Sequence, residues 1–221
     1  MAAYGAASVV LCSPAFAQGV DLTPTQKEKL AICAACHGPD GNSKDPLYPI
    51  LAGQTFRYLY IELQDFKAGR RQDPVMQPLA ATLEQPDMLA LAQYYAAQKP
   101  VSTGYSGDPA KVANGKKISD NALCPMCHLG GFMGQNEIPR GAGQYYAYIK
   151  KQLLAFRAKT RTNDAGSMTS VMAGMSDSDI EDLSQYVASL SEGGPKPGKQ
   201  RETTASLLSA AGLARVSLPF F

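Results

Sequence analysis

Residues 33–37 read Cys-Ala-Ala-Cys-His, and residues 124–128 read Cys-Pro-Met-Cys-His. This Cys-x-x-Cys-His pentapeptide is the attachment signal for c-type haem, in which two thiols bind one porphyrin and the histidine ligates its iron. The chain has only two histidines, and both stand in these pentapeptides. The sequence therefore predicts two covalently bound haem c groups. Their thioether cysteines are expected to be Cys33, Cys36, Cys124 and Cys127, and their histidine ligands His37 and His128.

The two pentapeptides belong to an internal repeat. They lie 91 residues apart, and each is followed in the same order by a proline, an Ala-Gly-Gln run, an aromatic helix, a methionine and a final tyrosine. Capping signals and helical periodicity appear in both halves, and no segment alternates like a strand. We therefore predict an all-α fold class with two tandem haem domains. Helices are expected from Pro24 to the first pentapeptide, from Pro109, over about 56–68 and 144–158, over Asp87–Tyr95 and from Ser176.

The second axial ligand of each iron follows by elimination. No histidine remains to supply it, and methionine is the usual alternative, which raises the reduction potential relative to histidine. Met76 is the candidate in the first half. In the second half the repeat favours Met168, and Met172 remains its rival. Met88 and Met175 fall on packing positions and are expected to lie in the core.

Other repeated residues have two possible roles. The carbonyl of Pro49 or Pro139 could accept a hydrogen bond from the ligating histidine and orient it, or the prolines could simply form turns. Arg70, Arg71 and Arg161 follow the middle helices. They could pair with haem propionates, or they could form a solvated charged face. The repetition of the prolines favours the orienting role for them, whereas the sequence leaves both roles of the arginines open.

These residues together resemble the dihaem class I cytochromes c of the cytochrome c4 family, over about residues 22–192. The resemblance implies two tandem class I cytochrome c domains, each wrapped around one covalent haem. It implies His37/Met76 and His128/Met168 coordination, in a periplasmic electron carrier that is not an enzyme. The family usually has a glycine after the haem histidine, as at Gly38. Leu129 takes that place in the second half, so the surroundings of the second haem are expected to differ.

The expected organisation and location follow from these features. We expect a signal peptide at 1–17, cytochrome c domains at 18–99 and 109–192, a linker at 100–108 and a disordered tail at 193–221. Attachment of haem to Cys-x-x-Cys-His takes place outside the cytoplasmic membrane, which predicts a periplasmic protein. The mature chain has no apolar run of the roughly 18 residues that a membrane span needs, so any membrane association is expected to occur through a partner. A net charge of +2 indicates no nucleic-acid partner.

The expected partners are redox proteins: an electron donor complex, and a terminal oxidase or a dehydrogenase. One alternative is the cytochrome subunit of a dehydrogenase complex of the flavocytochrome sulfide dehydrogenase type, with the tail as a docking segment. Another is a dihaem peroxidase, which needs one displaceable iron ligand. The matched methionines argue against it. A zinc site is disfavoured because the two cysteine pairs are too far apart in sequence.

Overall fold

The structure is a computed structural model that describes residues 20–191. The signal peptide expected at 1–17 and the tail expected at 193–221 lie outside the described residues. Within 20–191 the regular elements are helical, apart from an isolated bridge between Gln135 and Ile138. This confirms the predicted all-α class. No helix in the described part of the chain is both long and apolar enough to cross a membrane.

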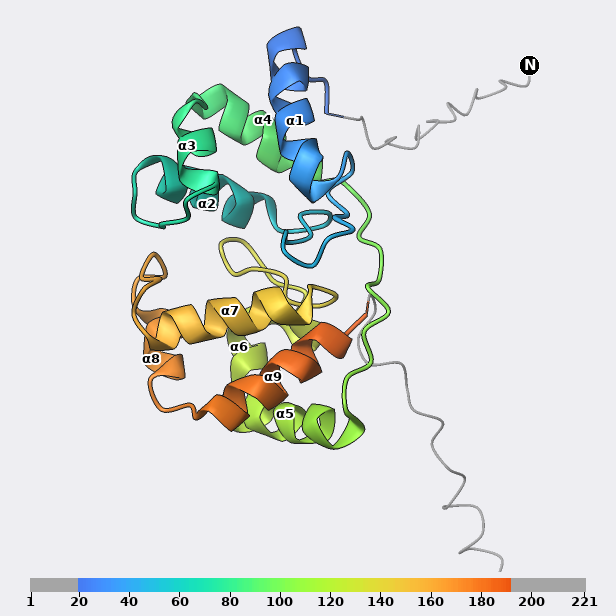
Figure 1. Cartoon of the computed structure of the whole chain (residues 1–221), viewed down its shortest axis with the longest axis vertical. Helices are drawn as coiled ribbons and strands as arrows, with labels where there is room; N and C mark the ends of the chain where they lie inside the picture. The colour runs from blue at the N-terminus through green and yellow to red at the C-terminus, as the bar shows by residue number, and fades with distance from the viewer. Residues whose placement is uncertain (1–19, 192–221) are drawn as a thin grey trace, which may run out of the picture.

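The helices form two groups that are stacked along the long axis of the molecule (Figure 1). The first group contains α1 (Pro24–His37), α2 (Phe56–Lys67), α3 (Met76–Ala81) and α4 (Gln85–Ala96). The second contains α5 (Pro109–Asn121), α6 (Cys124–His128), the 3-10 helix η1 (Gly130–Phe132), α7 (Tyr146–Arg157), α8 (Ser167–Met172) and α9 (Asp177–Ser189). The segment between α4 and α5 runs down one side and joins the two groups.

Local capping explains where several helices begin. At α1 the Gln26 N–H donates to the Thr23 hydroxyl at 3.3 Å, and the Thr23 N–H donates to Gln26 Oε1 at 3.0 Å. Ser176 and Asp179 form the same reciprocal pair at α9. Each pair satisfies two backbone N–H groups that the start of the helix would leave without partners. These helix starts are confirmed as predicted.

The helix that leads to the second pentapeptide is interrupted. In the first half α1 continues through Cys33 and Cys36, whereas α5 ends at Asn121 and α6 begins only at Cys124. Pro125 explains the break, because a proline within a helix clashes with the carbonyl four residues earlier, here that of Asn121. Leu123 adopts the left-handed conformation between the two helices, with φ 56°. Helix α5 therefore starts at Pro109 as predicted, but it ends before the second pentapeptide.

The two methionine segments also contain short helices that the sequence does not predict. Met76 is the first residue of α3, and Met168 lies in the first turn of α8. An Asp73 carboxylate oxygen accepts from the Met76 N–H at 3.0 Å. An Asp164 carboxylate oxygen accepts from the Thr169 N–H at 2.7 Å. Six-residue helices are too short to leave a periodic signal, but these aspartates fix where they begin.

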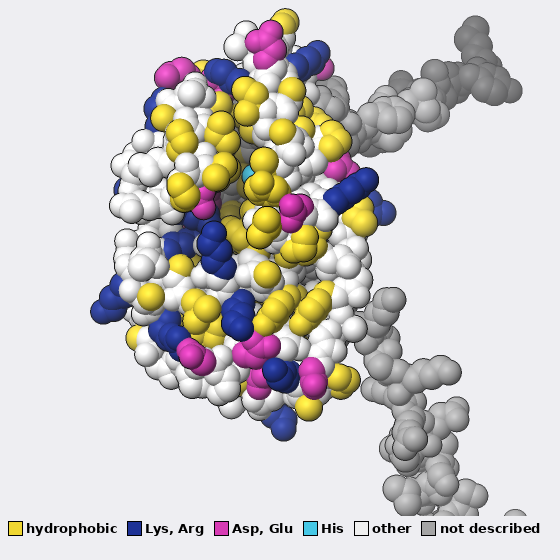
Figure 2. Space-filling model, viewed as in Figure 1, with side chains coloured by type: hydrophobic (Ala, Val, Ile, Leu, Met, Phe, Trp, Pro, Cys, Tyr) yellow, Lys and Arg dark blue, Asp and Glu magenta, His cyan; other side chains and the backbone are white. Residues whose placement is uncertain are grey.

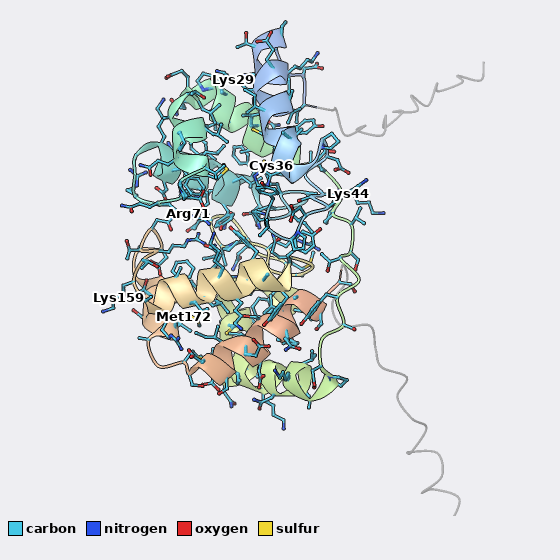
Figure 3. The ribbon with its side chains drawn as sticks, in the orientation of Figure 1. Lys29, Cys36, Lys44, Arg71, Lys159 and Met172 are labelled. Atoms are coloured by element: carbon cyan, nitrogen blue, oxygen red, sulfur yellow. The ribbon has the colours of Figure 1, made fainter. Side chains whose placement is uncertain are left out.

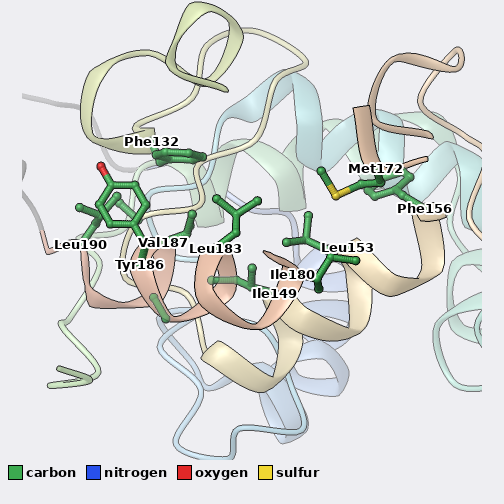
Figure 4. Packing of buried hydrophobic residues seen from close by; sticks show 12 residues of the cluster. Phe132, Ile149, Leu153, Phe156, Met172, Ile180, Leu183, Tyr186, Val187 and Leu190 are labelled. Carbon is green, nitrogen blue, oxygen red and sulfur yellow. The ribbon is translucent and has the colours of Figure 1, made fainter. Parts of the chain in front are cut away.

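Each half has its own apolar core. The larger one packs α5, α7, α8 and α9 together, with Phe132 beside Tyr186 at one end and Met172 beside Phe156 at the other (Figure 4). In the first half α2 and α4 supply Leu59, Met88 and Leu91. Met88 is buried and Met175 packs against the second core, so both core predictions are confirmed.

Candidate functional site

The four motif cysteines lie in the last turns of α1 and in α6, and none of them forms a disulfide. Cys33 and Cys36 are three residues apart in an unbroken helix, and Cys124 and Cys127 are likewise three residues apart in α6. Residues three apart in a helix lie on one face, so each pair presents two thiols to one side. Burial raises the pKa of the Cys33 and Cys124 thiols.

Both histidines are oriented by a proline carbonyl. His37 Nδ1 lies 2.9 Å from the Pro49 oxygen, and His128 Nδ1 lies 3.0 Å from the Pro139 oxygen. A carbonyl only accepts hydrogen bonds, so Nδ1 carries the proton and Nε2 is left for a metal. The structure therefore confirms the carbonyl role over a simple turn. Burial lowers the pKa of both histidines, which favours the neutral form that ligation needs.

The candidate methionines occupy different environments. Met76 and Met168 are half-buried, each in the first turn of a short helix. Met172 is fully buried at the end of α8, against Phe156 (Figure 4). In the first half the matching position near the end of α3 holds Ala80, which is also fully buried. Met172 therefore occupies a packing position that the repeat fills with alanine.

Leu129 adopts the backbone conformation of the glycine it replaces. Gly38 has φ 81° and ψ 154°, and Leu129 has φ 61° and ψ 165°. This region is almost restricted to glycine, because a Cβ there meets its own backbone. A Cβ at Gly38 would also lie 2.9 Å from the Asn42 carbonyl oxygen. The expected difference at the second pentapeptide is therefore a strained backbone immediately after His128.

The surroundings of the histidines differ further along the same loops. The carbonyl of Gly41 accepts from the N–H groups of residues 51 and 52, and the carbonyl of Phe132 accepts from those of residues 141 and 142. A Cβ at Gly41 would lie 2.7 Å from the Tyr95 ring, so in the first half the loop has a glycine and α4 supplies the aromatic ring. In the second half the arrangement is exchanged: the loop has Phe132 at the position that matches Gly41, and α9 has Val187 at the position that matches Tyr95. The Phe132 ring consequently stacks on His128, with centroids 5.4 Å apart and planes at 23°.

The outer surface around the second pentapeptide is more apolar than that around the first. Its exposed side chains are Leu123, Met126, Leu129 and Met133. The matching positions in the first half are Ile32, Ala35, Gly38 and Asn42. The face seen in Figure 2 has hydrophobic side chains over α1 and α4 and down to the middle of the molecule, with lysine and arginine side chains beside them where the halves meet.

The two halves are joined by buried charge. Glu62 on α2 accepts hydrogen bonds from both Arg71 and Arg161. Arg71 also donates to the Tyr148 hydroxyl at 2.9 Å, across the boundary between the halves (Figure 3). The idea of a solvated charged face is therefore wrong for Arg71 and Arg161, which are both buried. Arg70 is more exposed and pairs with Asp65.

The donor sets fit haem c rather than zinc. Each half contains two thiols on one helical face, one imidazole whose Nδ1 is hydrogen-bonded to a proline carbonyl, and one half-buried thioether in a short helix. Across residues 20–191 no group of three or more His, Cys, Asp or Glu side chains comes close enough together to hold a metal ion.

Comparison with known proteins identifies the family. The cytochrome c family model matches residues 112–191. Cytochrome c4 of Pseudomonas aeruginosa is 40% identical over 173 residues, which cover 73% of this chain and 85% of that protein. The chain belongs to the cytochrome c4 family. Its cofactor is haem c, and it is an electron-transfer protein rather than an enzyme.

A solved cytochrome c4 structure has the same fold. The crystal structure of reduced recombinant cytochrome c4 from Pseudomonas stutzeri superimposes with a TM-score of 0.70 at 37% identity, covering 76% of this chain and 97% of that one. The fold is therefore that of the class I cytochromes c. Another relative, the thiosulfate dehydrogenase electron acceptor of Thiomonas intermedia, is 33% identical over 174 residues and covers 72% of this chain and 78% of that protein.

Proposed function

We propose that this cytochrome c4 carries two haem c groups, one in each domain, and shuttles electrons between respiratory partners in the periplasm, toward a terminal oxidase. The domains are those at 18–99 and 109–192. The observation that supports this most strongly is that each half repeats the same donor set, with a histidine whose Nδ1 is bonded to a proline carbonyl. A protein with a single haem would use only one of these two donor sets.

The proposed iron ligands are His37 and Met76 in the first domain and His128 and Met168 in the second. Met168 matches Met76 in its partial burial and in its place in the first turn of a short helix. Met172 matches Ala80 instead, and its full burial in the core supports a packing role. The cysteines that anchor the two haems are Cys33, Cys36, Cys124 and Cys127.

The bound iron would accept and release one electron, and this is the only chemistry that the cofactor supplies. The protein contributes fixed ligands and a dry environment. The Pro49 and Pro139 carbonyls hold the imidazole rings in one tautomer. A methionine ligand raises the potential, which suits a carrier that delivers electrons to an oxidase. The apolar cores pack against Cys124 and Cys33, one thiol of each pair.

A periplasmic location is supported by two features of the sequence. Thioether attachment to Cys-x-x-Cys-His takes place outside the cytoplasmic membrane. The chain also carries an Ala-x-Ala cleavage pattern at Ala15-Phe16-Ala17, after an apolar run. Mass spectrometry of the protein from a periplasmic extract tests this. A mature chain that begins at Gln18 and carries two haems supports export, and an uncut chain from the cytoplasm contradicts it.

A second candidate function is electron acceptor for a dehydrogenase. The relative from Thiomonas intermedia, named as the electron acceptor of thiosulfate dehydrogenase, supports it. Stopped-flow mixing of the oxidised protein with a thiosulfate dehydrogenase and thiosulfate tests this role. Reduction within the turnover time of the dehydrogenase supports it. If the protein is not reduced in this mixture, yet its reduced form is oxidised by a terminal oxidase, the first function holds alone.

The ligand assignment is tested by the absorption band that methionine gives when it ligates ferric haem iron. We expect Met76→Ala and Met168→Ala each to remove about half of this band. Met172→Ala is the matched control, since it removes a thioether from the same short helix, and we expect the full band to remain. If Met172→Ala removes half of the band while Met168→Ala leaves it intact, Met172 is the ligand.

A further inference from the structure

Each half of the molecule holds the proline loop of the other half through one glutamine. Gln144 Oε1 accepts from the Ile50 N–H at 2.9 Å, and Gln144 Nε2 donates to the Ile50 carbonyl at 2.9 Å. Gln54 does the same to Arg140, at 2.6 Å for its oxygen and 2.9 Å for its nitrogen. All four residues are buried. The two glutamines belong to the repeated Ala-Gly-Gln runs, so the contact is reciprocal.

The same peptide groups also face the haem histidines. The Ile50 N–H and the Pro49 carbonyl are the two ends of one peptide unit, and the Pro49 oxygen accepts from His37 Nδ1. In the other half one peptide unit likewise joins the Arg140 N–H to the Pro139 carbonyl, which accepts from His128. A continuous hydrogen-bonded chain therefore runs from the glutamine of one half to the histidine of the other.

The hydrogen bonds in this chain strengthen one another by polarisation. A peptide whose N–H donates a hydrogen bond becomes more polarised, so its carbonyl oxygen becomes a stronger acceptor. A stronger acceptor at Nδ1 makes the imidazole a more basic ligand. A more basic ligand stabilises ferric over ferrous iron and lowers the reduction potential. The glutamine therefore acts on the iron of the opposite half without touching it.

We propose that Gln144 and Gln54 are positioning residues that lower the reduction potential of the haem in the opposite half. Gln144 acts on the first haem through His37, and Gln54 acts on the second haem through His128. This inference rests on the proposed histidine ligation. It makes the interface between the halves a part of each iron site, so that the potentials depend on the two halves staying in contact.

The sign of the effect separates this role from a merely structural one. Loss of the glutamine oxygen weakens the acceptor at Nδ1, so the potential of the opposite haem rises. A loosened interface would instead admit water, which favours the more highly charged ferric state and lowers the potential. The two causes therefore move the potential in opposite directions.

The experiment is a potentiometric titration of the full-length, haem-loaded protein with Gln144→Leu, followed by absorption and by the NMR signals of the ferric haems. The signals that Met76→Ala displaces identify the first haem. At a fixed applied potential we expect the ferric-to-ferrous ratio of the first haem to fall roughly threefold, a smaller effect than the roughly 10–100-fold loss of metal affinity or activity when a group bonded directly to a ligating histidine is removed. The second haem should not change, and Gln54→Leu should give the reciprocal result.

Two further variants keep the test decisive. Tyr145→Phe is the matched control, because it removes the 2.6 Å hydrogen bond from the Tyr145 hydroxyl to the Ser43 carbonyl across the same boundary, without touching either peptide. We expect no rise of either potential. Gln144→Glu retains an oxygen acceptor for the Ile50 N–H, so it should not raise the potential, even if Gln144→Leu fails to fold.

The outcomes are distinguishable from those that test ligation. If the wild-type protein lacks the methionine–iron band, the proposed ligands are wrong. If the wild type shows two methionine-ligated haems but Gln144→Leu lowers the potential, leaves it unchanged or matches Tyr145→Phe, the positioning role is overturned and the ligands stand. A rise with Gln144→Glu would also overturn it.

Discussion

Gly115 lies where α5 crosses α9, and a methyl group has no room there. A Cβ at this position would lie 2.1 Å from the Asp182 carbonyl oxygen and 2.8 Å from the Tyr186 Cβ. Ordinary contacts are roughly 3.5 Å, so Gly115→Ala must push the helices apart by about 1 Å. Overpacking costs about 1–3 kcal/mol, and we expect a cost near 3 kcal/mol here because a backbone carbonyl cannot rotate aside. The higher helix propensity of alanine offsets ~1 kcal/mol of this cost. We therefore expect the free energy of unfolding to fall by about 2 kcal/mol.

The assay is urea unfolding of the haem-loaded protein, followed by far-ultraviolet circular dichroism. Gly174→Ala is the matched control, because no atom lies within 4 Å of the Cβ that it adds and its φ is not positive. That variant should leave the free energy of unfolding unchanged or raise it by ~0.5 kcal/mol, through the lower entropy of its unfolded chain. The reasoning is refuted if Gly115→Ala is as stable as wild type, or if both variants lose the same amount.

Three other perturbations have defined outcomes. Gly38→Ala should lower the free energy of unfolding by about 1–3 kcal/mol, because alanine disfavours the positive φ of this residue. Leu129→Ala should lower it by less, because Leu129 already carries a side chain in that conformation. Equal losses for the two variants in urea unfolding would contradict the assignment of backbone strain to Leu129. Glu62→Gln should cost about 3–5 kcal/mol because it leaves two buried guanidinium groups without their carboxylate. Glu137→Gln, which breaks the exposed pair with Arg57, should cost less than ~1 kcal/mol; similar thermal midpoints for the two variants would refute this. Acidification should also destabilise the protein. Because burial lowers the pKa of His37 and His128, and the proposed iron ligation also requires their neutral form, the unfolded chain binds more protons, and stability is lost as the pH falls below about 6.5. A free energy of unfolding that stays constant between about pH 7.5 and about pH 5.5 would contradict this sign.

The features that the sequence predicts well are those with local causes. Thr23 and Ser176 begin helices through contacts three residues away, and the repeated pentapeptides indicate the cofactor chemistry directly. The role of the Pro49 carbonyl could also be proposed from the sequence, because the repeat places one proline 12 residues after His37 and another 11 residues after His128.

The features that the sequence does not predict depend on contacts between distant residues. Glu62 meets Arg161 only because the two halves pack together, and nothing local marks either side chain as part of an interface. The stacking of Phe132 on His128 depends on Val187 leaving space on α9. The repetition of Gln54 and Gln144 is visible in the sequence, but the hydrogen bonds of each glutamine to the opposite half are visible only in the structure.

The most direct test of the account is a spectroelectrochemical titration of the wild-type protein, combined with a determination of haem per chain. We expect two haem c groups per chain, both low-spin, which take up one electron each in two reversible steps while the methionine–iron band disappears on reduction. One haem per chain, or a ferric high-spin haem that binds peroxide, would contradict the account of a dihaem electron carrier.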